Sequence, residues 1–207
     1  FHGRTMATLT ASGSRKVQAG FEPLVPGFIR APFNDLEAIK TIASHRDDVV
    51  AVMLEPIQGE GGIYPVEEGY LRSLASLCEQ HDWMLILDEI QTGNGRTGKL
   101  FSYMHYGIQP DIVTTAKGLG NGVPIGACMM SKRAKDLFKP GNHGSTFGGN
   151  PLACATALTV LNVIERDKIC EQVSKNSATL FELLIKHLGE HPSVKSIRGK
   201  GFMIGIE

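Results

Sequence analysis

This sequence of 207 residues has no excess of charge of either sign and no long apolar run. It contains 21 Lys and Arg and 21 Asp and Glu, so its formal net charge is zero. Proteins that bind nucleic acid or anionic membranes usually carry basic patches or stripes, and none is visible here. No apolar run reaches the roughly 18 residues that indicate a membrane-spanning helix. The composition therefore gives no indication of a nucleic-acid or membrane partner.

Cysteine is scarce, and its spacing excludes the common metal motifs. The four cysteines are Cys78, Cys128, Cys154 and Cys170. No pair has the CxxC spacing of a zinc or redox site. Most of them lie in apolar or alanine-rich stretches, as reduced thiols that pack like small hydrophobic residues do. We interpret them as thiols of a cytoplasmic protein.

The histidines show no metal-ligand spacing either. His187 and His191 are one helical turn apart, but they flank Gly189 and precede Pro192. This pattern is typical of a solvated helix end rather than a zinc site. No metal is predicted.

Glycine is abundant, with 24 residues. Many of them cluster in four segments, at 59–62, 93–98, 118–126 and 141–149. Glycine lets the backbone turn tightly and approach other groups closely. The clusters predict loops around a ligand.

Apolar runs alternate with stretches of helical periodicity. Near-continuous runs at 49–54, 84–87, 112–115 and 125–130 predict strands that are buried on both faces. The spacing of apolar residues predicts helices at 35–45, 66–82, 151–166 and 169–188. Strands joined by helices favour right-handed crossovers. We expect an α/β fold with a mostly parallel sheet flanked by helices.

The chain divides into two parts in this interpretation. Residues 1–168 form most of a large domain, and residues 169–207 provide a linking helix and the first strands of a small C-terminal α+β domain. Residues 195–207 are expected to form a strand, a glycine turn and a second strand. The chain begins without Met at Phe1 and ends within an apolar run at Glu207. We expect it to be a fragment of a longer protein.

Two residues with chemical potential follow neighbouring strands. Asp88 comes directly after the strand at 84–87, and Lys117 lies between the strand at 112–115 and the glycine-rich segment 118–122. In open parallel sheets, ligands bind outside the carboxyl ends of the strands, so both side chains should face one crevice. Burial would lower the pKa of a lysine there and favour its neutral, nucleophilic amine.

Five segments resemble the class III aminotransferases that depend on pyridoxal 5'-phosphate. They are FHGRT at 1–5, EPIQGEGG at 55–62, LDEIQTG at 87–93 with GRTG at 95–98, PDIVTTAKGL at 110–119 and GSTFGGNP at 144–151. They occur in the family's order along nearly the whole chain. The resemblance implies the fold type I large domain of these transferases. It also implies an enzyme that moves the terminal amino group of N-acetylornithine, or of a similar acyl-ornithine or ω-amino acid, to 2-oxoglutarate in arginine biosynthesis.

The resemblance also implies the residues that bind the cofactor. Lys117 would form the resting Schiff base and then move a proton between substrate and cofactor. Asp88 would hold the proton on the ring nitrogen, which keeps the ring an electron sink. Gln91 would bind the phenolic oxygen, and Phe1 would stack on the ring. Glu89 and Ile90, between Asp88 and Gln91, complete the expected cofactor-binding segment.

Further roles concern the phosphate and the substrate. By resemblance, Thr146 reaches the cofactor phosphate from a partner subunit, so a homodimer with shared active sites is expected. Ser145 would touch the substrate, and the planar guanidinium of Arg4 would pair with a substrate carboxylate. Glu60 would act as a gate that pairs with a second arginine. That arginine and the family's phosphate-binding loop are expected outside these 207 residues, so we expect the fragment alone to be inactive.

One alternative from another class stays open at this point. The segment GNGRTGK at 93–99 matches the G-x-x-x-x-G-K pattern of a P-loop nucleotide hydrolase and follows an apolar strand. Against it, Leu100 stands where Ser or Thr would bind Mg²⁺. Residues 101–107 are also a poor start for the helix that would bind phosphate. A third possibility is a chain that binds the cofactor without being an enzyme by itself.

Overall fold

A four-stranded sheet forms the centre of the computed structural model, which describes residues 2–207. Its strand order is β1-β4-β5-β6. The strands are β1 (Ala51–Leu54), β4 (Met84–Asp88), β5 (Ile112–Thr115) and β6 (Ala127–Met130). The first three run parallel, and β6 is antiparallel to β5. The predicted α/β fold with a mostly parallel sheet is confirmed.

The prediction that all four strands are buried on both faces was wrong for the outer two. Met53 in β1 is 47% exposed, and Ala127, Cys128 and Met129 of β6 are exposed. Both strands lie at edges of this sheet, so each has a neighbour on one side only. In the central strand β4, by contrast, Leu85 and Leu87 are almost completely buried.

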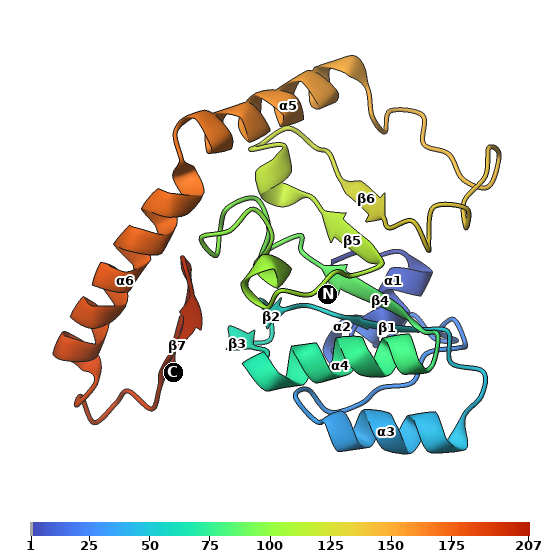
Figure 1. The fold of residues 1–207 in the computed structure, drawn as a ribbon, viewed down its shortest axis with the longest axis horizontal. Coiled ribbons are helices and arrows are strands. Elements are labelled where there is room, and N and C mark those ends of the chain that lie inside the picture. Colours follow the sequence, from blue (N-terminus) through green and yellow to red (C-terminus); the bar gives the residue numbers. More distant parts are fainter. Residues whose placement is uncertain (1) are drawn as a thin grey trace.

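Two amphipathic helices are stacked beside β4, with α4 (Glu68–Gln80) next to the sheet and α3 (Leu36–His45) outside it (Figure 1). Helix α4 packs on β4, and α3 packs on α4. Asp35 caps α3 by accepting a hydrogen bond from the Ala38 N–H at 2.9 Å. Leu71 and Leu74 of α4 are completely buried. Burying one such leucine contributes roughly 1.5–3 kcal/mol, so this layer is a principal source of stability.

Two long helices form an arm along the outside of the molecule (Figure 1). Helices α5 (Pro151–Arg166) and α6 (Ile169–Leu188) have the bounds that the sequence predicts. The Asn150 side chain accepts from the Ala153 N–H at 3.0 Å, and Pro151 occupies the first turn, where its missing N–H costs no helix bond.

The C-terminal residues form the predicted hairpin. Strands β7 (Ile197–Lys200) and β8 (Met203–Ile206) pair antiparallel, and β7 contacts a second small hairpin formed by β2 (Ile57–Gln58) and β3 (Tyr64–Pro65). The sequence did not predict that second hairpin. Four other short elements were also not predicted: α1 (Met6–Ala11), α2 (Arg15–Gln18), η1 (Ser102–His105) and η2 (Lys117–Leu119). Over residues 2–207, no helix is both long and apolar enough to cross a membrane.

Candidate active site

Asp88 and Lys117 meet at the carboxyl edge of the sheet. Asp88 is the last residue of β4, and Lys117 follows the end of β5, the strand beside it. The imidazole of His2 lies between them. Its Nδ1 is 2.9 Å from Asp88 Oδ2, and its Nε2 is 2.9 Å from Lys117 Nζ. The sequence placed Asp88 and Lys117 in one crevice, but the histidine that connects them was not recognised as a site residue.

The environment of Asp88 favours its ionised form. The residue is 2% exposed, and burial by itself raises the pKa of this carboxyl. The hydrogen bond and charge of His2, together with the N–H that Ile90 donates to Oδ1 at 3.0 Å, outweigh burial and hold the pKa of Asp88 below its ordinary value. A carboxylate is therefore available at neutral pH to bind a protonated ring nitrogen.

The backbone presents Lys117 in an unusual conformation. Its φ is +42°, in the left-handed region that non-glycine residues rarely adopt. Asn94 fixes the chain just before it, donating from Nδ2 to Thr115 Oγ1 at 2.9 Å and to the Ala116 carbonyl at 3.2 Å. The expectation that Lys117 is buried was wrong: the residue is exposed, because its side chain projects from the sheet edge into an open cavity.

Gln91 has a buried acceptor for which residues 2–207 provide no hydrogen-bond donor. Its Oε1 is shielded from solvent yet unpaired within the described chain. Buried polar atoms are almost always paired, so this oxygen can accept a hydrogen bond from a bound group. Gly59 lies directly over it, and a Cβ at that position would come 2.0 Å from Oε1. A ring hydroxyl of a bound cofactor is the kind of group this amide fits.

A cavity of about 470 Å³ opens beside these residues. This is within the usual range for small-molecule sites. Gln91 and Lys117 lie on one side, and Ile169 and Val173 of α6 lie on another. The remaining lining comes from the turn at Ile63, from residues 93–96 and from residues 202–204 of the C-terminal hairpin. The cavity is thus polar where the lysine enters and apolar toward the arm. Among residues 2–207, no cluster of His, Cys, Asp and Glu could hold a metal ion.

Glu89 uses its carboxylate within the protein. It is completely buried, and it accepts hydrogen bonds from Thr92 Oγ1 and from the N–H groups of Ser102 (3.0 Å) and Tyr103 (2.8 Å). Burial raises the pKa of Glu89, and these hydrogen bonds oppose that effect. Its side chain holds η1 against the end of β4, while its backbone N–H donates to the Thr114 carbonyl at 2.9 Å and its carbonyl accepts from the Gly93 N–H at 2.8 Å.

Comparison with known proteins identifies the family. The model of the class-III aminotransferases matches residues 1–207. This chain belongs to the class III aminotransferases.

Individual relatives of the family agree with this membership. The chain is 52% identical to the acetylornithine aminotransferases of Nitrosomonas europaea and Caldanaerobacter subterraneus, over all of this chain and 53% and 52% of theirs. The chain therefore spans about half the length of these curated relatives. An ornithine aminotransferase from Toxoplasma gondii, described with partial occupancy of PLP at its active site, superposes with a TM-score of 0.94 at 39% identity, over 100% of this chain and 49% of that one. An acetylornithine aminotransferase from Elizabethkingia anophelis superposes with a TM-score of 0.81 at 41% identity, over 86% of this chain and 47% of that one.

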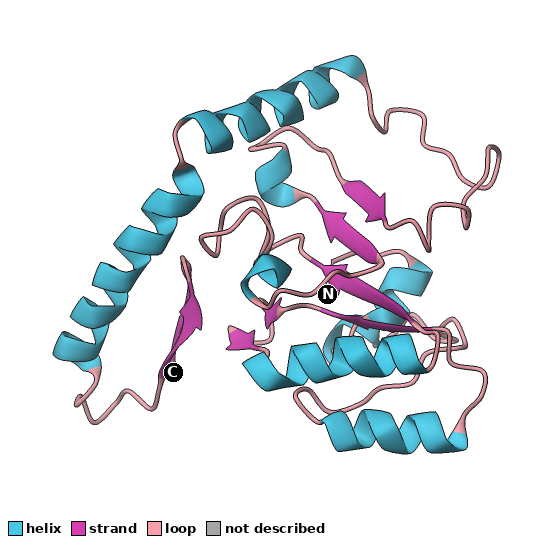
Figure 2. Ribbon diagram, in the orientation of Figure 1, coloured by secondary structure: helices cyan, strands magenta, loops and turns pink. Residues whose placement is uncertain are grey.

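The other expected residues of this class III aminotransferase do not gather at the cavity. Ser145 and Thr146 lie in the exposed loop that precedes α5, far along the chain from the cavity lining (Figure 2). Ser145 Oγ accepts from the Gly148 N–H at 3.0 Å. Arg4 and Glu60 are both exposed and absent from the cavity lining; Arg4 lies before α1, and Glu60 lies in the turn between β2 and β3. The role given to Phe1 lies outside the described residues.

The P-loop alternative does not agree with the fold. Residues 93–98 form successive turns, and the next element is η1, a 3-10 helix of four residues. A P-loop needs a long helix whose N-terminus faces the phosphates. Gly98 instead packs against Ser174 of α6, where a Cβ would come 2.3 Å from the hydroxyl oxygen. Gly95 and Gly98 thus serve the contact between the loop and α6.

Proposed function

We propose that the protein carrying this chain transfers the terminal amino group of N-acetylornithine to 2-oxoglutarate, with pyridoxal phosphate bound at Lys117. The observation that carries the proposal is the row of Asp88, His2 and Lys117 at one sheet edge, beside the unpaired Oε1 of Gln91. The choice of donor is supported by the acetylornithine aminotransferases to which the chain is 52% identical. Arginine biosynthesis is the pathway this reaction implies.

Four residues would hold the cofactor. Lys117 would bind its aldehyde carbon through Nζ, and Asp88 would accept a hydrogen bond from its protonated ring nitrogen. Gln91 would bind the ring oxygen, and Ile90, which lines the cavity, would lie against the ring. When bound, pyridoxal phosphate supplies a protonated ring that withdraws electrons from the substrate carbon.

The proton transfers fall to Lys117. Once the substrate amine displaces it, the free Nζ would take a proton from the amine-bearing carbon of the substrate and deliver it to the cofactor carbon that Lys117 had held. His2 lies within hydrogen-bond distance of both Nζ and Asp88 in this structure, so it keeps the carboxylate in place and ionised. We assign His2 a positioning role in this site.

Substrate and subunit contacts complete the proposal. Arg4 would anchor a substrate carboxylate, with Ser145 touching the substrate and Glu60 acting as the gate. Thr146 would bind the cofactor phosphate of a partner subunit, which its exposure outside the cavity of its own chain supports. The functional unit is then a homodimer. Residues 1–168 would belong to the large domain and residues 169–207 to the start of the small one.

We place the reaction in the cytoplasm. The cysteines at 78, 128, 154 and 170 are all free thiols. Cys78 is buried, and burial raises the pKa of its thiol to about 12, so it packs as a small hydrophobic residue. Unpaired thiols are typical of reducing compartments.

A steady-state comparison of amino donors tests this function. The full-length protein, loaded with pyridoxal phosphate, is assayed with 2-oxoglutarate and N-acetylornithine, succinylornithine, ornithine or 4-aminobutyrate. We expect the highest kcat/KM with N-acetylornithine. A higher value with ornithine or 4-aminobutyrate would assign a different donor to the same site. No transfer from any amine would contradict the proposal.

A further inference from the structure

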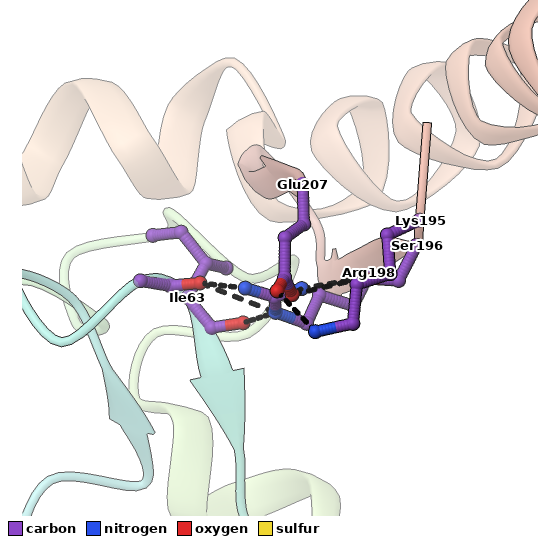
Figure 3. A network of polar contacts seen from close by, with 6 residues as sticks. Ile63, Lys195, Ser196, Arg198 and Glu207 are labelled. Carbon is purple, nitrogen blue, oxygen red and sulfur yellow. Dashed lines mark hydrogen bonds and ion pairs between the residues drawn. The ribbon is translucent and has the colours of Figure 1, made fainter. Parts of the chain in front are cut away.

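Arg198 of β7 connects the C-terminal hairpin to the turn formed by residues 59–63, between β2 and β3. Its Nε donates to the carbonyls of Ile63 at 3.0 Å and Gly62 at 3.2 Å, and its Nη2 donates to Gly62 at 2.8 Å. Figure 3 shows the guanidinium between these carbonyls and the carboxylate of Glu207. One side chain thus binds two consecutive carbonyls that are more than a hundred positions away in sequence.

The guanidinium is held rigidly on its other sides. Nη1 donates to Glu207 Oε2 at 2.6 Å and to Ser196 Oγ, and the guanidinium carbon lies 4.0 Å from the centre of the Tyr64 ring. The Arg198 side chain is only 19% exposed. A planar donor fixed by a carboxylate and an aromatic face loses little freedom when it binds the turn, and lysine cannot reproduce this geometry.

The turn needs such external support. Ile63 has a φ of +58°, a left-handed conformation that is costly for a β-branched residue, and Gly62 has a φ of +113°. Backbone of this kind persists only when its surroundings hold it in place. The contacts of Arg198 fall on the carbonyls of these same two residues.

The turn is also part of the candidate active site. Gly59 packs on the amide of Gln91, Ile63 lines the cavity beside Lys117, and Glu60 is the expected gate. A shift of the turn by a fraction of an ångström would move all three features together.

We propose that Arg198 is a positioning residue of the active site. From the C-terminal hairpin it fixes the 59–63 turn, and through the turn it sets the packing of Gly59 on Gln91 and the position of Glu60. This inference rests on the proposed function, because the roles of Gln91 and Glu60 belong to it. A movement of the C-terminal hairpin would thereby shift Gln91 at the cofactor ring and Glu60 at the substrate gate.

Three substitutions in the full-length protein separate this role from a simple ion pair. Arg198→Met removes every donor to the turn, and Arg198→Lys keeps the charge but cannot bind both carbonyls. Lys195→Met is the matched control, because Lys195 Nζ also pairs with Glu207, at 2.6 Å, yet the Lys195 side chain is 77% exposed and this pair does not involve the turn. All three substitutions alter the surroundings of the Glu207 carboxylate.

A fourth substitution presses on the turn without any change in charge. A Cβ on Gly205 would come 3.0 Å from Ile63 Cβ and 3.2 Å from the Gly62 carbonyl oxygen. Gly205→Ala should therefore displace the turn while Arg198 is intact. It also keeps the proposal testable if the Arg198 variants fail to fold.

Two readouts are measured on the holoenzymes. We expect faster amide hydrogen exchange at residues 59–63 in Arg198→Met, Arg198→Lys and Gly205→Ala than in wild type and Lys195→Met. We also expect the ratio of kcat/KM for the amino donor to that for 2-oxoglutarate to change by about tenfold or more in the Arg198 variants. The visible band of the lysine-bound cofactor should also change its pH dependence, because Gln91 binds the ring oxygen.

The outcomes are distinct. The positioning role is overturned if the Arg198 variants match Lys195→Met in amide exchange, in the substrate ratio and in the visible band. Equal losses of kcat/KM for both substrates, with an unchanged band, would also overturn it, since they indicate general destabilisation. A wild-type protein without the cofactor band would instead refute the proposed function, while the exchange comparison would still report on the turn.

Discussion

At the scale of single residues, the site depends on His2 joining two strand ends. Asp88 contacts one nitrogen of the His2 imidazole, and Lys117 contacts the other. His2 was not recognised from the sequence, because roles in the segment at 1–5 were assigned only to Phe1 and Arg4. The signal that could have found it is a polar side chain next to the residue expected to stack on the ring.

The state of Asp88 predicts how stability depends on pH. Its pKa in the folded protein is below the ordinary value of a free carboxyl, so its ionisation stabilises the fold above that ordinary value. This contribution is lost as the pH falls through the lowered pKa. Asp88→Asn should reduce the free energy of unfolding at neutral pH by about 1.5–3 kcal/mol, typical for a hydrogen bond to a charged group, and flatten its decline in acid.

Chemical denaturation of the cofactor-free, full-length protein between pH 3 and pH 7 measures this dependence. Asp136→Asn, which changes an exposed carboxylate, is the matched control and should follow wild type. A parallel decline in acid for Asp88→Asn and wild type would show that Asp88 carries no such linkage.

At the scale of elements, local patterns predicted the long helices and the central strands well. Helix α5 begins at Pro151, which suits a first helical turn, and α6 ends just before Gly189, because such end signals come from neighbouring residues. The β2–β3 hairpin has strands of two residues, too short for any periodicity, and depends on Arg198 from the other end of the chain. The exposure of β1 and β6 depends on strand order, which hydrophobicity alone does not reveal.

Only part of the site could be predicted from the sequence, because several of its contacts depend on the order of the strands. Asp88 and Lys117 were found because strand ends of a parallel sheet share one edge. Asn94 and the close packing of Gly59 on Gln91 join segments that are distant in sequence, and they become visible only once the strands are in order. Glu89 was assigned with its neighbours, but its buried carboxylate accepts from the N–H groups of Ser102 and Tyr103, which lie 13 and 14 positions further along the chain.

Helix α4 should carry much of the stability of the sheet layer. Leu74→Ala removes a completely buried side chain from the core beside Leu87, so it should lower the free energy of unfolding by about 2–5 kcal/mol. Ser73→Ala, at an exposed position of the same helix, should change it by less than about 0.5 kcal/mol. Equilibrium denaturation of the full-length variants measures both, and equal effects would contradict the assigned packing.

At the scale of the whole molecule, the loop before α5 presents Thr146 away from the cavity of its own chain. Phe147 beside it is 80% exposed, and Leu152 and Leu158 of α5 are 71% and 60% exposed. Large apolar side chains left this exposed are typical of a surface that meets a partner. They agree with the proposal that Thr146 serves the site of a second subunit.

Mixed dimers test that sharing directly. Lys117→Ala and Thr146→Ala should each be impaired alone, but a dimer of one with the other contains one site with both native residues. Co-refolding equal amounts should restore about a quarter of the wild-type activity, because about half of the dimers are mixed and each has one intact site. Mixing Lys117→Ala with a Lys117→Arg variant is the control and should restore none. The absence of any gain in the first mixture would place Thr146 in the site of its own chain.

The covalent bond between Lys117 and the cofactor is the central claim, and chemical trapping tests it most directly. The full-length protein loaded with pyridoxal phosphate is reduced with borohydride, digested and examined by mass spectrometry, with Lys117→Ala and Lys99→Ala treated in parallel. We predict that wild type and Lys99→Ala carry the reduced cofactor on the peptide that contains Lys117, and that Lys117→Ala carries none and lacks the visible band. A cofactor adduct on another lysine in wild type, or a band that persists in Lys117→Ala, would contradict the account.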